Sequence, residues 1–226
     1  VGLSAAGAPA REAAELLQQQ GSLTPADHLA IARVQRAQGL HAESIDGYRQ
    51  WLAAGTGTSA EQAAVHMEHA NALFYAERYD EVESALGPIM RDVNARFLLA
   101  RAESHANRPA QSIRTYLAIA KDYPRSGTGA QALFLAAGIH HEENERGRAR
   151  ALYRRVVAEY PRSAQMALSR MRLAGMSFLE KEYDDAARIW DEYRTRFPRG
   201  QYILEATYWA GRARQLAGDS AGAAAH

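Results

Sequence analysis

Small and aromatic apolar residues recur along the second half of the chain at a step of 37 residues. Prolines mark the step inside three similar tripeptides: Tyr123-Pro124-Arg125, Tyr160-Pro161-Arg162 and Phe197-Pro198-Arg199. A large aromatic residue stands eight positions before each proline, at Tyr116, Tyr153 and Trp190. Small residues keep the same register, at Ala100, Ala137, Ala174 and Gly211, and at Ser112, Ala149, Ala186 and Ala223. Several columns in one register indicate a tandem repeat, and a period of this length is typical of a solenoid.

The regular pattern that begins at Asn94 predicts helices paired into hairpins. We expect helices at roughly 94–106, 109–122, 129–143, 146–159, 165–181, 184–196 and 202–217. The small residues let the two helices of a hairpin approach closely, and the large aromatic residue fills the space between one hairpin and the next. The proline ends the second helix, because it lacks a backbone N–H donor and disfavours helical geometry in the residue before it.

The repeat pattern is more diverged in the first part of the chain. We expect a first helix between Pro9 and Gly21. A second helix should begin at Thr24 and Pro25 and end at Gly39, with its partner helix starting near Ala42. A further helix, capped by Ser59, should run to about Glu77, and the short helix after it should be disturbed at its end by Gly87-Pro88. The prediction is an all-α chain, a right-handed superhelical α-solenoid of about six tandem hairpins. Residues 1–226 would form one domain, with diverged repeats in 1–91 and regular repeats in 92–226, the last one truncated.

Composition narrows the function without naming it. Lys and Arg number 27 against 26 Asp and Glu, so the net charge of +1 does not call for a nucleic-acid partner. The lack of cysteine excludes disulfides and Cys-based zinc sites, and we expect no cofactor. No apolar run reaches about 18 residues, so no transmembrane helix is expected. The chain starts at Val1 without an initiator methionine and ends inside an expected helix, which suggests removal of a targeting segment or a truncation.

Two ladders of residues are candidates for binding. The groove ladder lies on the first helices of the repeats and has two columns at the 37-residue step. One column is Phe97, Phe134, Met171 and Tyr208. The other is Arg101, Gly138, Gly175 and Arg212, of which the two arginines are the binding candidates. Such positions can line a concave face and hold a peptide or stack on sugar rings; ordinary packing between hairpins is the alternative. The edge ladder consists of Arg125, Arg162 and Arg199. These arginines can contact carboxylates of a peptide or of murein stems, or can cap the preceding helices.

Histidines offer weaker candidates. His66 and His69 lie three residues apart, so they share a helix face that could ligate a metal, but no third ligand follows from the spacing. The run His140-His141-Glu142-Glu143 places imidazole beside carboxylate, yet adjacent residues on a helix point in different directions. We interpret both groups as structural or solvated residues. No catalytic, cofactor-binding or metal-binding residue is assigned.

The repeat resembles the tetratricopeptide repeat, which has a small residue in the first helix, alanine early in the second, an aromatic residue four later and proline eight after that. The copies here depart from that family in their step of 37 residues instead of about 34, and in lacking its first-helix tryptophan and tyrosine. The longer step with a Tyr-Pro-x-Ser turn is similar to helical repeats of bacterial envelope proteins. The segment from Glu205 to Ala213, followed by Leu216-Ala217-Gly218-Asp219, resembles the last superhelical repeats of soluble lytic murein transglycosylases.

The second resemblance implies a non-catalytic scaffold that precedes a lysozyme-like catalytic domain. That domain would lie beyond His226, so the segment itself is not expected to be an enzyme. The partner would be a protein or peptide, or murein glycan through the attached domain. The implied location is the periplasm or cell envelope, with the cytoplasm as the alternative. The competing hypothesis is a free-standing repeat adaptor that binds a protein partner in its groove.

Overall fold

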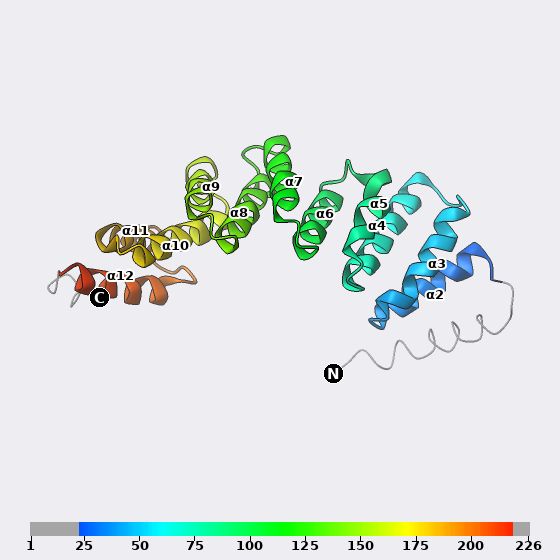
Figure 1. The fold of residues 1–226 in the computed structure, drawn as a ribbon, viewed down its shortest axis with the longest axis horizontal. Helices are drawn as coiled ribbons and strands as arrows, with labels where there is room; N and C mark the ends of the chain where they lie inside the picture. Colours follow the sequence, from blue (N-terminus) through cyan, green and yellow to red (C-terminus); the bar gives the residue numbers. More distant parts are fainter. Residues whose placement is uncertain (1–22, 219–226) are drawn as a thin grey trace. The chain divides into compact units, whose positions relative to one another are not determined.

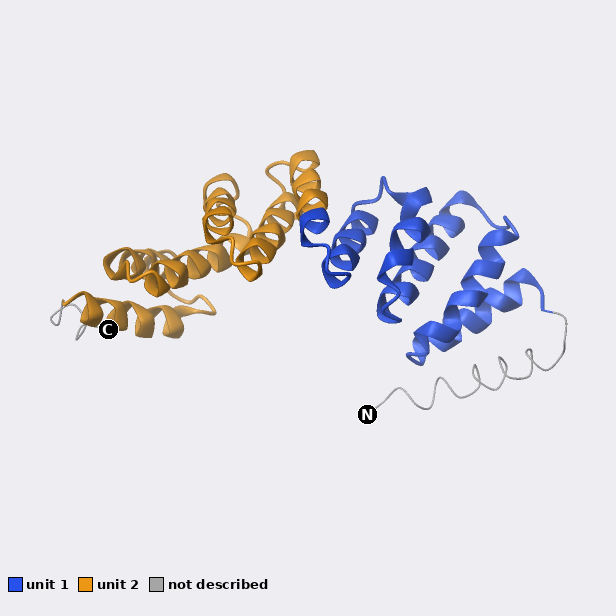
Figure 2. Ribbon diagram, in the orientation of Figure 1, with its two compact units in different colours: residues 1–112 blue, residues 113–226 orange. Residues whose placement is uncertain are grey.

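A computed structural model describes residues 23–218, and these residues form helices joined by short turns (Figure 1). The predicted all-α class built of helix hairpins is confirmed. The helix expected between Pro9 and Gly21, and Ala223 in the small-residue pattern, lie outside the described residues. The chain divides into two compact units, residues 1–112 and 113–226 (Figure 2). Among the described helices, none is long and apolar enough to cross a membrane.

In the first unit each helix packs on the next along the chain. Side chains at helical spacing, such as Tyr48, Val65 and Leu73, are almost completely buried between them. The elements are α2 (Pro25–Ala37), α3 (His41–Ala53), α4 (Ser59–Tyr75), α5 (Tyr79–Leu86), the 3₁₀ turn η1 (Gly87–Ile89) and α6 (Val93–His105). The short α5 and its conversion to a 3₁₀ turn at Gly87-Pro88 agree with the prediction.

Threonines begin two helices of the first unit by reciprocal capping. The Thr24 hydroxyl accepts a hydrogen bond from the Asp27 backbone N–H at 3.3 Å, and the Asp27 carboxylate accepts one from the Thr24 N–H at 2.9 Å. Thr58 and Glu61 repeat this arrangement at the start of α4, at 3.3 and 2.7 Å. The expectation that Ser59 caps α4 was therefore wrong by one residue. Thr58 has the extended backbone that a cap requires, whereas Ser59 is already helical.

Helix α7 (Pro109–Asp122) begins in the first unit and ends in the second. The second unit then contains α8 (Gly127–Glu142), α9 (Arg146–Glu159), α10 (Ala164–Leu179), α11 (Tyr183–Arg196) and α12 (Ile203–Ala217). Helices α8 and α9 form one hairpin, α10 and α11 form the next, α9 packs on α10, and α12 packs on α11. Helices α7, α9 and α11 each end two residues before the proline of their repeat, as the sequence predicts.

The repeating small and aromatic residues form the interior of the second unit. Ala137 and Ala174 in the first helices, and Ala149 and Ala186 in the second helices, have no accessible surface. The aromatic column is equally buried: Tyr153 keeps 2% of its surface exposed and Trp190 keeps 3%. The packing roles predicted for these two columns are consistent with this burial.

A left-handed residue ends each first helix at the same 37-residue step. Asn107, Asn144, Lys181 and Gly218 have φ angles of 58°, 59°, 65° and 90°. After Asn144 and Lys181, the next backbone N–H donates to the carbonyl five residues earlier, at 2.8 Å in both turns. This pattern satisfies carbonyls that the end of a helix leaves free, and it reverses the chain into the second helix.

Serine closes the turn that follows each second helix in the two best-matched repeats. The Ser126 hydroxyl donates to the Tyr123 carbonyl at 2.6 Å, and the Ser163 hydroxyl donates to the Tyr160 carbonyl at 2.9 Å. Ser126 also accepts a hydrogen bond from the Gly129 N–H at 3.1 Å, so it caps α8 as well. The hydrogen bonds that the serine makes therefore explain why the Tyr-Pro-x-Ser spacing recurs in these two repeats.

Candidate functional site

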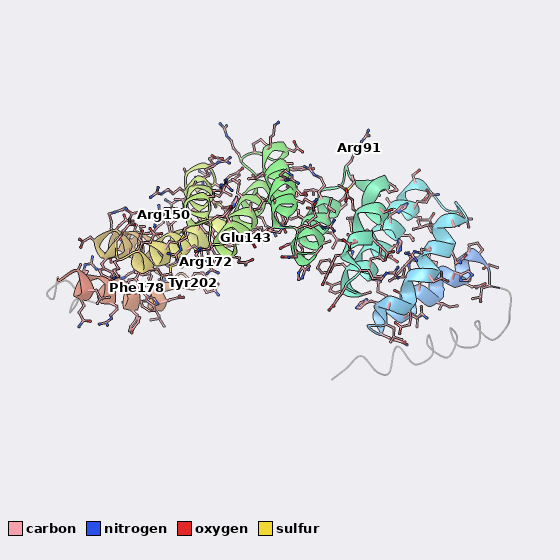
Figure 3. The ribbon with its side chains drawn as sticks, viewed as in Figure 1. Arg91, Glu143, Arg150, Arg172, Phe178 and Tyr202 are labelled. Carbon is pink, nitrogen blue, oxygen red and sulfur yellow. The ribbon has the colours of Figure 1, made fainter. Side chains whose placement is uncertain are left out.

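The candidate functional site is a cavity of about 440 Å³ in the second unit, between the first helices α10 and α12. Most of its wall is apolar, and the described residues that line it are His141, Leu168, Met171, Arg172, Gly175, Met176, Phe178, Leu179, Trp190, Tyr202, Glu205 and Trp209. Figure 3 labels Arg172, Phe178 and Tyr202 of this wall. The volume lies in the range of pockets that hold ligands, which are typically apolar with a few polar groups.

The cavity exists because α10 and α12 are held apart. Helices α8 and α10 pack on each other directly, and α10 also packs on α9 and α11, whereas α12 packs mainly on α11. Gly175 faces the resulting gap, and a Cβ atom built there would have nothing within 4 Å. A glycine at this point of a helix leaves space that any other residue would partly fill.

Three aromatic rings from three helices build one side of the cavity. The indoles of Trp190 in α11 and Trp209 in α12 are stacked, with centroids 6.2 Å apart and planes at 23°. Phe178 in α10 meets both of them edge-on, with centroids 5.8 Å from Trp190 and 5.2 Å from Trp209. The cluster therefore connects α10, α11 and α12 through ring contacts of the edge-on and stacked kinds that aromatic pairs prefer. Trp190 is buried, while Phe178 and Trp209 are only half-buried.

Two charged side chains of opposite sign stand on opposite walls of the cavity. Arg172 belongs to α10 and Glu205 to α12, and both are exposed. Neither makes a hydrogen bond or ion pair with any residue that the structure describes. Two further polar atoms of the wall, Trp190 Nε1 and His141 Nδ1, are buried and have no hydrogen-bond partner within residues 23–218. The site therefore combines an apolar interior with polar groups that the fold leaves unused.

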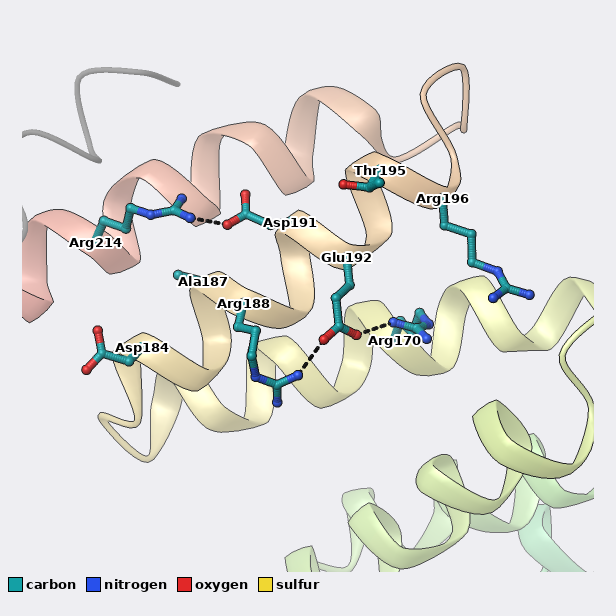
Figure 4. A pocket seen from close by; sticks show the side chains of 9 residues that line it. All are labelled: Arg170, Asp184, Ala187, Arg188, Asp191, Glu192, Thr195, Arg196 and Arg214. Atoms are coloured by element: carbon teal, nitrogen blue, oxygen red, sulfur yellow. Dashed lines mark hydrogen bonds and ion pairs between the residues drawn. The ribbon is translucent and has the colours of Figure 1, made fainter.

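A second hollow of about 660 Å³ lies over α10, α11 and α12 and differs in its electrostatics (Figure 4). Its charges neutralise one another: Glu192 accepts from Arg170 at 2.6 Å and from Arg188 at 2.5 Å, and Asp191 pairs with Arg214. Burial would raise the pKa of Glu192, but the hydrogen bonds from Arg170 and Arg188 outweigh it and hold that pKa below its usual range. Because most of its charges are already paired, this hollow is the weaker candidate.

The structure places the groove ladder in different environments. Met171 lines the cavity, and so does Gly175 of the companion column. Phe134 instead packs within its own hairpin, 5.6 Å from Tyr153 between ring centroids. Tyr208 is 65% exposed and meets Trp209 edge-on, but it is not among the residues that line the cavity.

The arginines of the groove ladder also make local contacts. Arg212 donates to the Gln215 side-chain oxygen at 2.7 Å within α12. Arg101 belongs to the first unit, where its guanidinium lies over the Phe74 ring at 4.5 Å from the centroid. Phe97 is half-buried in the same unit.

The edge ladder occupies the turns after the second helices. Arg125, Arg162 and Arg199 are all exposed, and Arg125 has a left-handed backbone with φ of 57°. None of the three makes a hydrogen bond or ion pair within the described chain, so their side chains do not cap the preceding helices. A neighbouring arginine contacts this edge instead: Arg196 donates to the Pro161 carbonyl at 3.0 Å.

The histidines have structural contacts. His66 Nδ1 lies 3.1 Å from the Ala85 carbonyl, and His69 is buried beside Tyr48. His140 Nδ1 is hydrogen-bonded to the Glu145 carboxylate, whereas its neighbour His141 lines the cavity. No cluster of three or more His, Cys, Asp or Glu suited to a metal ion occurs in residues 23–218.

Sequence reasoning missed most of the cavity wall. Arg172 and Trp209 stand one position after Met171 and Tyr208 of the groove ladder, and His141 and Phe178 form a separate column at the same 37-residue step. A search for aromatic and charged residues on both sides of the ladder could have found them. The opening of the cavity had no signal in the pattern except Gly175.

Comparisons with known proteins agree with the fold. Residues 94–126 and 131–163 match the model of the tetratricopeptide repeat. The chain is similar to the C-terminal part of a TPR repeat-containing protein from Cytophaga hutchinsonii, with 11% identity, 97% of this chain and 87% of that chain covered, and a TM-score of 0.69. The chain is also similar to a tetratricopeptide repeat protein from Parabacteroides merdae, with 13% identity and a TM-score of 0.59. That match covers 89% of this chain and 76% of the other. YrrB, described as a TPR protein with an unusual peptide-binding site, is 12% identical to this chain, with a TM-score of 0.50. That match covers 87% of this chain and 96% of YrrB.

These likenesses show that the chain is a TPR-like helical repeat protein, as the first resemblance implied. No curated protein sequence matches the chain. The resemblance to lytic murein transglycosylases finds no support in the comparisons and stays a prediction.

Proposed function

We propose that the second unit binds a protein partner by receiving a bulky apolar side chain of a short peptide segment in the cavity between α10 and α12. The observation that carries the proposal is the cavity itself, with its half-buried Phe178 and Trp209 and the open space beside Gly175. Burying an apolar side chain there would remove its surface and that of both rings from water. About 25 cal/mol is gained for each Å² of apolar surface removed.

The position of the cavity favours a peptide over a fully enclosed small molecule. The wall is assembled from first helices of successive repeats, from His141 at the end of α8 to Glu205 in α12, and repeat proteins use such extended surfaces to hold chain segments. Leu179, which also lines the cavity, is 69% exposed, so part of this apolar surface is open to a partner. A peptide could therefore anchor one side chain and lay its neighbours on the surrounding helices. Among proteins of similar fold, YrrB is described as having a peptide-binding site.

The experiment is a peptide selection with a variant that fills the cavity and removes none of its lining side chains. A displayed library of random peptides is selected on the wild type, on Gly175→Phe, and on the matched control Gly175→Ala. We expect the wild type and Gly175→Ala to enrich common peptides with a bulky apolar residue, and Gly175→Phe to bind them at least about tenfold more weakly. Equal binding to Gly175→Phe, or no enrichment on the wild type, would contradict the proposal.

The finer proposal, derived from the resemblance of residues 205–219, is that this scaffold belongs to a murein-processing lytic transglycosylase of the cell envelope. Its test is the coding sequence that follows His226. A downstream lysozyme-like domain with a catalytic glutamate followed by serine would support it, and a stop codon within one or two repeats would count against it. In that case the adaptor function would stand alone.

A further inference from the structure

We infer that the bound segment carries charges of both signs around its apolar anchor, an acidic group that meets Arg172 and a basic group that meets Glu205. This inference rests on the proposed function and deepens it by stating what the peptide must contain. It is carried by the placement of two side chains of opposite charge on the two walls of one apolar cavity. A purely apolar ligand would leave both charges unmatched.

The α12 wall suits a basic side chain. Glu205 and Trp209 are four residues apart on the helix, so they lie on the same face, and both line the cavity. A lysine or arginine that runs along this face would place its charge at the Glu205 carboxylate and its stem against the indole of Trp209.

The α10 wall suits an acidic side chain. Arg172 lies one turn after Leu168 on α10, and both line the cavity; Arg172 is exposed to solvent there. A guanidinium can bind a carboxylate through two parallel hydrogen bonds. Gly175 follows on the same helix and leaves the approach to this wall open.

The charges around the cavity contrast with those of the second hollow. In the second hollow, Arg170 of α10 and Arg188 of α11 share Glu192, and Arg214 of α12 pairs with Asp191. Arg150 of α9 similarly reaches Glu180 and Glu182, at 2.6 and 3.0 Å. Most of these ion pairs join neighbouring helices, whereas Arg172 and Glu205 at the apolar cavity have no such partner among the described residues. Charge complementarity therefore favours a partner segment with both signs over an uncharged one.

The test is a selection with charge-reversed proteins. The same peptide library is selected on the wild type, Arg172→Glu and Glu205→Lys, with Glu192→Gln as a matched control outside the cavity. We expect wild-type peptides to contain an acidic and a basic residue flanking the anchor. Arg172→Glu should replace the acidic residue by a basic one while keeping the anchor, and Glu205→Lys should do the reverse. Each reversal should weaken a wild-type peptide by about tenfold, and the reciprocal peptide should restore binding.

The outcomes separate this inference from the function on which it rests. If all four proteins select the same peptides, the inference is overturned but the apolar site stands. If the wild type enriches no peptide at all, the proposed function itself is overturned. Two other occupants are also tested. If the wild type is a dimer in solution and Gly175→Phe is a monomer, the occupant is a second copy of the chain. If an uncharged apolar peptide binds as tightly as the charged one, the site recognises only the apolar anchor. Both the dimer result and this result would contradict the inference.

Discussion

Trp190 and Trp209 stack across the interface of α11 and α12, with their ring centroids 6.2 Å apart. The two indoles have different environments, because Trp190 is 3% exposed and Trp209 is half-buried at the cavity. One ring of the pair therefore belongs to the core, while the other is available to a ligand. The pair links the stability of the second unit to its proposed binding site.

This difference predicts unequal effects of truncation. Trp190→Ala should destabilise the second unit by about 3–5 kcal/mol, because it leaves a large void in a closely packed cluster. Trp209→Ala should cost about 1–2 kcal/mol, since Trp209 is already partly exposed to water, yet it should abolish peptide binding. Denaturant unfolding and a binding titration measure the two effects. Equal losses of stability would show that both rings are core residues.

Two glycines should respond to alanine in opposite ways. Gly175→Ala should stabilise the protein by up to about 1 kcal/mol, because alanine is the better helix former and its Cβ meets nothing within 4 Å. Gly129→Ala should destabilise it by about 1–3 kcal/mol, because its Cβ would lie 2.3 Å from the Tyr123 carbonyl oxygen and 2.9 Å from the Tyr160 hydroxyl. Thermal unfolding of the two variants provides the comparison, and a loss of stability in Gly175→Ala would mean that the helix is more crowded there than described.

The left-handed turn at Lys181 predicts a stabilising substitution. Lysine at φ of 65° carries a steric penalty that glycine avoids, and Gly218 occupies the equivalent position one repeat later. Lys181→Gly should raise the free energy of unfolding by about 0.5–1 kcal/mol. Lys181→Ala is the control, because alanine has the same Cβ and should give no gain. A gain for both variants would point to the lysine charge and not to the backbone.

Stability of the first unit should fall as the pH is lowered from neutral towards 4. Burial, with smaller contributions from the positive charges of Arg49 and His66, lowers the pKa of His69 to about 4 from 6.5. Between those values the unfolded chain binds a proton that the folded chain does not, so protonation favours unfolding. The loss amounts to up to about 3 kcal/mol by pH 4. The variant His69→Gln should lose most of this dependence between pH 4 and 6.5; an unchanged pH profile in that variant would assign the effect to other groups.

The helices could be predicted from the sequence because each repeat encodes its own hairpin. Small residues such as Ala137 and Ala149 mark where helices touch, and each repeat proline sets the end of a second helix through purely local chemistry. The turn after α10 was harder to read, because Lys181 occupies a left-handed position where glycine or asparagine is expected.

The cavity could not be predicted in the same way. It depends on how α10 and α12 lie relative to each other, on contacts among three rings from three helices, and on the open space beside Gly175. Trp209 has Arg172 as its counterpart one repeat earlier, so its column shows no repeated residue type. A periodic pattern identifies what the repeats share, whereas this site arises from what one repeat has alone.

The central claim is that the cavity receives the ligand, and tryptophan fluorescence tests it most directly. The chain has three tryptophans, and a Trp51→Phe variant leaves only Trp190 and Trp209, both at the cavity. A fluorescently labelled selected peptide would be titrated into this variant, with binding followed by anisotropy and the tryptophan emission recorded in parallel. We predict that the emission shifts with the same midpoint as binding, and that adding Gly175→Phe removes both signals. Binding that leaves the emission unchanged, or that persists in Gly175→Phe, would place the ligand elsewhere and contradict the account.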